Sequence, residues 1–174
     1  DVNLSLLLTR LVKDAHSFQS KVKISSAIAP NVIWRCDKTL VYQLIHNLYA
    51  NAVNYIQTQG WIHFTLAASN GIFQLTVENP TLGIPADLSE RAFDRFYRGD
   101  ASRQRTDEGA GLGLAITKSI IHAHHGDVSV CSGLGKTRFS VTLPIVSTAG
   151  EACSSCPAQG QDLPTISPVQ ESCS

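Results

Sequence analysis

The sequence predicts an α/β fold, a two-layer sandwich in which one mixed sheet carries helices on one face. Segments with helical and strand periodicity alternate in the order helix, strand, helix, two strands, loop, helix, two strands. Two of the strand segments are joined by Asn70-Gly71, a dipeptide typical of tight hairpins. Hydrophobic residues make up 43% of the 174 residues, which is enough apolar material for the core of one domain.

The first third of the chain is expected to form helix, strand and helix. Apolar residues at helical spacing predict a helix over residues 4 to about 18, and weak alternation predicts a strand over residues 22–28. Asp37 is a favourable N-cap for a long helix that reaches about residue 56. Its expected buried stripe is Val41, Ile45, Leu48, Ala52 and Ile56, and the other side carries Asn47, Asn51 and Asn54, with Tyr55 at the flank.

The rest of the chain is expected to add strands on both sides of a long irregular segment. Alternation predicts strands over residues 61–67 and 72–78, a loop over 80–85 and a short helical turn from 89 to about 96. Residues 97–108 are polar, rich in Arg and without periodicity, so a mobile loop is expected. A helix and two strands follow over residues 112–124, 127–131 and 138–143, with Gly133 and Gly135 in the turn between the strands.

Charge and composition narrow the classes of function. The 14 basic and 14 acidic residues balance, which gives no support to nucleic-acid binding. No apolar run is long enough to cross a bilayer, and the absence of Met suggests a part of a longer protein. Cys36 and Cys131 are expected to behave as small apolar residues. Residues 147–174 are rich in Ser, Pro, Gln and Cys, and we expect a disordered tail in which Cys153, Cys156 and Cys173 are incidental.

Two polar motifs indicate the chemistry. Gly109, Gly111 and Gly113 lead directly into an apolar helix, whose free N–H groups and positive dipole end can bind an anion. Asn47 and Asn51 lie one turn apart on the long helix, and their carboxamide oxygens can ligate a hard cation such as Mg²⁺. The glycines fit neither the Rossmann pattern nor the P-loop. Together the two motifs predict a site for a nucleotide with its metal ion.

Four segments carry a more specific signal: Asn47-x-x-x-Asn51-Ala52, Asn79-x-x-x-Gly83-Ile84-Pro85, Phe93-Asp-Arg-Phe96-Tyr-Arg98-Gly-Asp100 and Gly109-x-Gly111-Leu-Gly113-Leu-Ala-Ile116. Their residues, order and spacing resemble the N, G1, F and G2 boxes of the sensor histidine kinases, which belong to the GHKL superfamily with gyrase, Hsp90 and MutL. The resemblance covers about residues 1–144. It implies a Bergerat-type sandwich, with a histidine-kinase ATP-binding catalytic domain over residues 1–146 and a mobile ATP lid over 97–108.

The resemblance implies roles at the phosphate end of the nucleotide. Asn51 would bind the Mg²⁺ that bridges the ATP phosphates, Asn47 would assist, and Arg98 would reach the triphosphate, so these three are the expected catalytic residues. Phe93 and Phe96 would anchor the base of the lid, and Phe96 would also contact the nucleotide. The other residues expected near the phosphates are Asn54, Gly109, Gly111, Leu112 and Gly113, with Arg95, Arg103 and Arg105 as further candidate phosphate ligands.

At the base end the resemblance implies that Tyr55 packs beside the adenine, with Asn79, Gly83 and Ile84 around it. The family's G1 box normally begins with Asp, which accepts a hydrogen bond from the adenine amino group. Asn79 stands in its place, and a neutral carboxamide is a weaker acceptor than a carboxylate. Thr81 replaces the first G1 glycine and narrows the conformational freedom of the loop. Adenine selectivity is therefore the property that these departures affect most.

Further departures refine the resemblance. Asn54 replaces a basic residue that is often found three positions after the second N-box Asn, and Ala110 replaces the common Ser or Thr of the G2 box. The form Glu78-Asn79-Pro80 resembles a subset of these kinases that sense copper, silver and other heavy metals.

The resemblance implies the partners of such a domain. The γ-phosphoryl group of ATP would pass to a His on a separate dimerisation domain of the parent chain, which is absent here, and then to a response regulator. The chain would be the cytoplasmic portion of a bacterial inner-membrane sensor. Two alternatives remain open: an ATPase that hydrolyses its nucleotide, which needs a Glu where this chain has Asn47, and a nucleotide-binding or interaction module with weakened or lost kinase activity.

Overall fold

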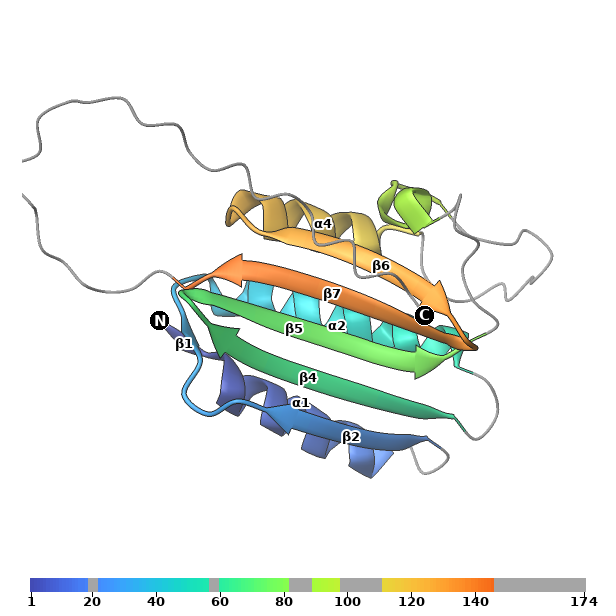
Figure 1. Cartoon of the computed structure of the whole chain (residues 1–174), viewed down its shortest axis with the longest axis horizontal. Helices are drawn as coiled ribbons and strands as arrows, with labels where there is room; N and C mark the ends of the chain where they lie inside the picture. The colour runs from blue at the N-terminus through green and yellow to red at the C-terminus, as the bar shows by residue number, and fades with distance from the viewer. Residues whose placement is uncertain (19–21, 57–59, 82–88, 98–110, 146–174) are drawn as a thin grey trace, which may run out of the picture.

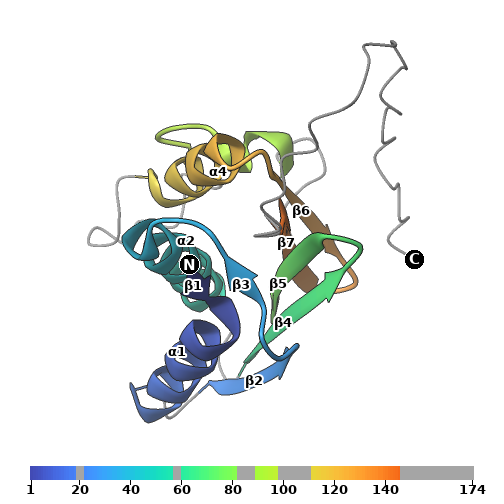
Figure 2. The ribbon, with the colours of Figure 1, turned by 90° about the vertical axis from the view of Figure 1, so that its left-hand side faces the viewer.

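A computed structural model of the chain describes residues 1–18, 22–56, 60–81, 89–97 and 111–145. A five-stranded mixed sheet has the strand order β2-β4-β5-β7-β6, and helices α1, α2 and α4 cover one of its faces (Figures 1 and 2). The predicted two-layer α/β class is confirmed. The C-terminal tail lies outside the described residues, as do the expected lid apart from Tyr97 and most of the loop expected over residues 80–85.

The elements follow the predicted order closely. The helices are α1 (Leu4–Phe18), α2 (Lys38–Tyr55) and α4 (Gly113–Ala123), with a short 3-10 helix, η1 (Glu90–Phe93). The strands of the main sheet are β2 (Lys23–Ile28), β4 (Trp61–Ser69), β5 (Ile72–Pro80), β6 (Asp127–Gly133) and β7 (Lys136–Pro144). In the described ranges, no helix combines the length and apolar character needed to span a membrane.

A second, two-stranded sheet was not predicted. Strand β1 (Val2–Asn3) pairs antiparallel with β3 (Ile33–Trp34), and Val2 lies opposite Trp34. Two residues are too few for a period of two to be recognised in a sequence, so only the tertiary pairing identifies these strands.

Helix α2 begins and packs as its sequence predicts. The Asp37 side chain accepts a hydrogen bond from the Thr39 N–H at 2.6 Å, and that hydrogen bond lowers the pKa of the Asp37 carboxyl. Ile56, expected at the end of the buried stripe, is instead the C-cap and only partly buried. The buried residues of the helix are Val41, Leu44, Ile45, Leu48 and Ala52.

The two hairpins of the main sheet have similar turns. Asn70 and Gly71 have φ values of 51° and 74°, the left-handed pair that a two-residue hairpin of type I′ requires. The β6–β7 turn uses Leu134 and Gly135, at φ 51° and 75°. Gly133, predicted in this turn, is instead the last residue of β6 and pairs with Lys136. The expected position of the turn was therefore wrong for Gly133 and correct for Gly135.

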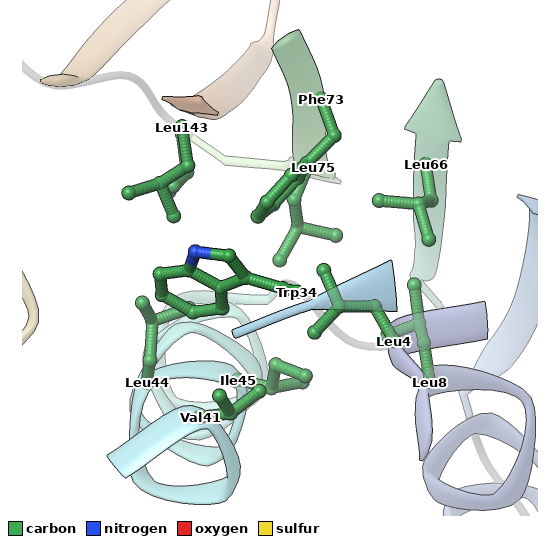
Figure 3. A pocket seen from close by; sticks show the side chains of 11 residues that line it. Leu4, Leu8, Trp34, Val41, Leu44, Ile45, Leu66, Phe73, Leu75 and Leu143 are labelled. Carbon is green, nitrogen blue, oxygen red and sulfur yellow. The ribbon is translucent and has the colours of Figure 1, made fainter. Parts of the chain in front are cut away.

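Trp34 is the centre of the core beneath the sheet. It is only 2% exposed, and its ring meets Phe73 edge-on at 5.4 Å between centroids and His124 at 4.7 Å. Leu4 and Leu8 of α1 and Leu44 of α2 lie around the same ring (Figure 3). A cavity of about 10 Å³ remains among these apolar side chains, which is too small for any ligand larger than water.

The two cysteines expected to be inert apolar residues differ in state. Cys36 has a free thiol, and burial raises its pKa to about 11, which leaves it protonated at neutral pH. Cys131 is disulfide-bonded, so the expectation of a free apolar thiol was wrong at this position.

The uncovered face of the sheet carries an ion pair network around Glu78. The Arg138 Nε donates to the Glu78 carboxylate at 2.7 Å, and the Lys136 Nζ lies 3.4 Å from the same oxygen. Burial by itself would raise the pKa of Glu78, but the hydrogen bond and charge of Arg138, with Lys136, bring it below the ordinary value of 4.5.

Glu78→Gln is therefore expected to reduce stability fully above the pKa of an unfolded glutamate, and not at all below the lower pKa of the folded state. A carboxyl with a lowered folded pKa adds stability at neutral pH and loses that contribution as the pH falls through the folded value. We expect a loss of about 1 kcal/mol or less at neutral pH, because the two cations are partly exposed. Urea unfolding of the wild type and the variant at neutral and acidic pH measures this loss of stability. A loss of equal size at both pH values would contradict the assignment.

Candidate functional site

The predicted site residues that the structure describes come from α2, the end of β5, the segment around η1 and the start of α4. Helices α2 and α4 lie beside each other on the same face of the sheet (Figure 2). Gly83, Ile84, Arg98, Arg103, Arg105, Gly109 and Ala110 lie outside the described residues.

Asn47 joins α2 to the first turn of α4. Its Nδ2 donates to the Gly113 carbonyl oxygen at 3.0 Å and lies 3.5 Å from the Thr117 hydroxyl, which itself donates to the same carbonyl. Thr117 is completely buried, and a Cβ added at Gly113 would come within 3.6 Å of the Asn47 Cγ. The tertiary structure thus brings together the two motifs that the sequence singled out, although they are 66 residues apart.

The carboxamides of α2 offer oxygen ligands of the kind that Mg²⁺ prefers. Since the Asn47 Nδ2 is held by a carbonyl, only its Oδ1 is left to face a cation. Asn51, one turn later, is half-buried, and its side chain makes no hydrogen bond to any other described residue. Asn54 and Tyr55 are exposed in the last turn of the helix. This donor set of neutral oxygens fits Mg²⁺ shared with phosphate, and the described residues contain no cluster of three or more His, Cys, Asp or Glu for another metal.

Asn79 has a buried side-chain oxygen that lacks a hydrogen-bond donor among the described residues. The residue is 1% exposed, and its Nδ2 faces the carbonyl oxygens of Ala52 at 3.4 Å and Pro80 at 3.5 Å. Two acceptors on that side fix the orientation of the amide. Its Oδ1 is buried and, within the described residues, without a hydrogen-bond donor. Such an oxygen costs about 1–3 kcal/mol when it stays unpaired, so it indicates a ligand that donates to it.

Thr137 belongs to this site and was missed in the sequence. It lies directly opposite Asn79 in the β5–β7 register, and its hydroxyl lies 2.7 Å from that of Thr81 and 2.8 Å from that of Ser132. The alternation of the strand could have identified it. Every second residue of β7 is buried, and Thr137 is the polar residue among them. Thr81, expected only to stiffen the loop, also donates its N–H to the Gly135 carbonyl at 3.0 Å.

The segment around η1 is anchored by Phe93 and not by the side chain of Phe96. The Phe93 ring is buried edge-on against Phe139 at 6.4 Å, with the Lys118 Nζ 5.9 Å above it. Phe96 is 70% exposed, so the prediction that its ring anchors the lid was wrong. Its backbone supplies the link, because the Phe96 N–H donates to the Gly111 carbonyl at 3.1 Å.

The start of α4 has the features of an anion site. Leu112 is its N-cap and provides no side-chain hydrogen bond, so the first N–H groups of the helix are not capped by that residue. Gly111 precedes it with φ 68°, and a Cβ there would lie 3.1 Å from the backbone of Phe96 and Tyr97. The sequence predicted these glycines as part of a phosphate-binding loop, and the structure shows that Gly111 also allows a close approach to the backbone of Phe96 and Tyr97.

Gly111→Ala is expected to displace the segment 95–97 and to weaken nucleotide binding by about tenfold. The added methyl group meets backbone atoms that cannot rotate away, and the left-handed φ costs about 1 kcal/mol in addition. Calorimetric titration with ATP and urea unfolding measure the two effects.

Gly71→Ala is the matched control for this prediction. Gly71 has φ 74° but no atom within 4 Å of an added Cβ, so it reports the backbone cost without a clash. Equal ATP affinity in the two variants would contradict the proposed contact.

Comparison with known proteins gives a consistent picture. Residues 36–147 match the family described as histidine kinase-, DNA gyrase B-, and HSP90-like ATPase. The chain is 44% identical over 108 residues to the probable sensor kinase SilS of Salmonella typhimurium, a match that covers 62% of this chain and 22% of SilS. The chain therefore spans about a fifth of the length of this relative.

Solved structures share the fold. The mycobacterial sensor histidine kinase MprB has a TM-score of 0.73 at 22% identity, with 82% of this chain and 96% of that chain covered. Full-length ShkA in complex with AMPPNP has a TM-score of 0.69 at 26% identity, with 82% of this chain and 30% of that chain covered.

Proposed function

The chain belongs to the family of histidine kinase-, DNA gyrase B- and HSP90-like ATPases, and on this premise we propose that it binds ATP with Mg²⁺ and transfers the γ-phosphoryl group to a histidine. The histidine lies on a dimerisation domain of the same parent protein, and a response regulator receives the group afterwards. The relative SilS is named a probable sensor kinase, and ShkA has been crystallised with AMPPNP, which supports the choice of ATP.

The buried Oδ1 of Asn79 is the observation that carries the proposal. An adenine amino group donates hydrogen bonds, whereas the oxygen of a 6-oxopurine would meet another acceptor. The carbonyl oxygens of Ala52 and Pro80 fix the orientation of the Asn79 amide. If its oxygen and nitrogen exchanged places, both of these hydrogen bonds would be lost. Asn79 therefore selects adenine even though it is neutral.

The phosphates are proposed to lie between α2 and the start of α4. Asn51 and the Oδ1 of Asn47 hold Mg²⁺, which neutralises charge on the phosphates when it is bound. The first N–H groups of α4, which the Leu112 side chain does not cap, receive phosphate oxygens, and Arg98 reaches the triphosphate from the lid. These groups position the γ-phosphoryl and offset its charge, which is the main demand of phosphoryl transfer.

The chain is proposed to transfer phosphate rather than to hydrolyse ATP. The expected position of the water-activating Glu of the hydrolysing relatives is occupied by Asn47, whose carboxamide is not a base and is bound to Gly113. The base for the accepting histidine is proposed to come from the dimerisation domain.

The cellular setting is proposed from the same resemblance. The parent protein is a bacterial inner-membrane sensor with this domain, residues 1–146, in the cytoplasm. Similarity to SilS supports the heavy-metal-sensing subgroup that the form Glu78-Asn79-Pro80 resembles.

Two measurements test the proposal. Calorimetry with ATP and GTP, each with and without Mg²⁺, should show Mg²⁺-dependent binding of ATP and weaker binding of GTP. The chain is then mixed with the parent dimerisation domain and labelled ATP, and acid-labile phosphohistidine should form. Absence of nucleotide binding would overturn the proposal, while binding without transfer would identify a nucleotide-binding module that lacks kinase activity.

A further inference from the structure

We propose that Asn79 also acts as a positioning residue: its Nδ2 holds the last turn of α2 and so couples the base subsite to the metal-binding helix. The inference rests on the proposed function, since it assigns a second role to a residue of the same site. The observation behind it is the hydrogen bond from the Asn79 Nδ2 to the Ala52 carbonyl oxygen. Recognition of the base by the Asn79 Oδ1 would not require that hydrogen bond.

Ala52 offers a carbonyl oxygen that α2 itself leaves free. In a continuous helix the Ile56 N–H would donate to it, but the chain turns away at Ile56 and this N–H donates to Val53 at 3.4 Å. The Asn79 Nδ2 takes the vacant place at 3.4 Å. Both Ala52 and Asn79 are buried, so bulk water does not supply the missing donor, and among the described residues the Asn79 side chain supplies it.

A carboxylate at this position could not make the same contact. The Asp expected from the family pattern has only acceptor atoms when ionised, and it would face the oxygens of Ala52 and Pro80. It would also stand at the negative end of the α2 dipole, where the last turn has no basic residue. Asn79 therefore provides a link between β5 and α2 that an Asp cannot provide.

The link gives the two halves of the nucleotide a physical connection. Ala52 follows Asn51 directly, so a contact that fixes the Ala52 carbonyl also restrains the backbone of the metal-binding residue. A donor that binds the Asn79 Oδ1 polarises the amide and strengthens donation from its Nδ2. At 3.4 Å that hydrogen bond is long and has room to shorten. Binding of a base at Asn79 therefore restrains the last turn of α2, next to the proposed Mg²⁺ ligand Asn51.

The test uses a ligand without a base. Inorganic triphosphate with Mg²⁺ is titrated into the wild-type chain, Asn79→Ala and Asn79→Asp, and ATP and inosine triphosphate are titrated in parallel. Asn79→Ala should weaken Mg²⁺-triphosphate binding by about fivefold, the factor that one net hydrogen bond contributes. Asn79→Asp should show the same loss while it keeps the preference for ATP over inosine triphosphate. Gln74→Ala, which removes an exposed carboxamide from the same strand, should change neither affinity.

The outcomes separate the two proposals. Unchanged Mg²⁺-triphosphate affinity in Asn79→Ala, with weaker ATP binding, would overturn the coupling and leave the proposed function in place. No binding of ATP by the wild-type chain would overturn both.

If neither variant folds, hydrogen exchange on the wild-type chain decides. ADP without Mg²⁺ should slow exchange at residues 53–56, and triphosphate without Mg²⁺ should not. Equal exchange with both ligands would overturn the coupling.

Discussion

Asn51→Ala is expected to remove most of the Mg²⁺ dependence of ATP binding and to slow phosphoryl transfer at least about 100-fold, equivalent to about 3 kcal/mol of transition-state stabilisation. The physical reason is the loss of a neutral oxygen ligand from the one half-buried carboxamide of α2 that has no partner among the described residues. Asn47 cannot take over the lost position, because its Nδ2 is held by Gly113 and its Oδ1 is already the other proposed ligand of the metal ion. Binding is measured by calorimetry with and without Mg²⁺, and transfer by labelled phosphohistidine on the dimerisation domain.

Gln43→Ala is the matched control for Asn51→Ala. It removes a carboxamide of the same chemical type from an exposed position of the same helix, two turns earlier. It should leave Mg²⁺ dependence and transfer as in the wild type. If Asn51→Ala kept a Mg²⁺ dependence equal to that of Gln43→Ala, the metal would not be held by α2 at this position.

Trp34→Ala is expected to lower the free energy of unfolding by about 3–5 kcal/mol. The indole is 2% exposed, and it fills the space between the two-stranded sheet, α2 and the main sheet (Figure 3). Its removal also ends the edge-on contacts with Phe73 and His124, so the end of α4 loses a neighbour. Urea unfolding followed by circular dichroism gives the difference.

The chain's other Trp makes this prediction specific. Trp61 lies at the start of β4 and is 37% exposed, so Trp61→Ala should cost far less, about 1 kcal/mol. Similar losses in the two variants would show that Trp34 does not form the centre of the core. Single-Trp variants made with Phe would in addition report local unfolding separately at the two positions.

The fold could be predicted where an element is long enough to show its period. Helix α1 matches its expected bounds, and Asp37 starts α2 as its side-chain chemistry predicts. The hairpin at Asn70-Gly71 follows from the left-handed φ values that few residue types adopt without cost. Strands β1 and β3 were not predicted, because only their pairing with each other defines them. An alternation with a period of two cannot be recognised in two residues.

The sequence predicted which residues belong to the site better than it predicted the contacts that they make. The spacing of Asn47 and Asn51 placed both on one helix, and Gly111 and Gly113 lie at the start of another as expected, while Gly109 lies outside the described residues. The expectation for Phe96 failed because a sequence does not say which of two aromatic residues, three apart, faces the core after a 3-10 turn. Thr137 was missed because its importance comes from the strand opposite it, which carries Asn79.

The sequence alone determined which residues share a helix face or a strand face, since these are set by local periods of the backbone. It also determined the family, through residue types at short spacings. Only the tertiary structure decided which polar atoms lack a partner among the described residues, because a hydrogen bond such as Asn79 to Ala52 joins residues 27 positions apart. The unpaired Oδ1 of Asn79 and the engaged amide of Asn47 are therefore facts of packing, and the function proposed for the site depends on both.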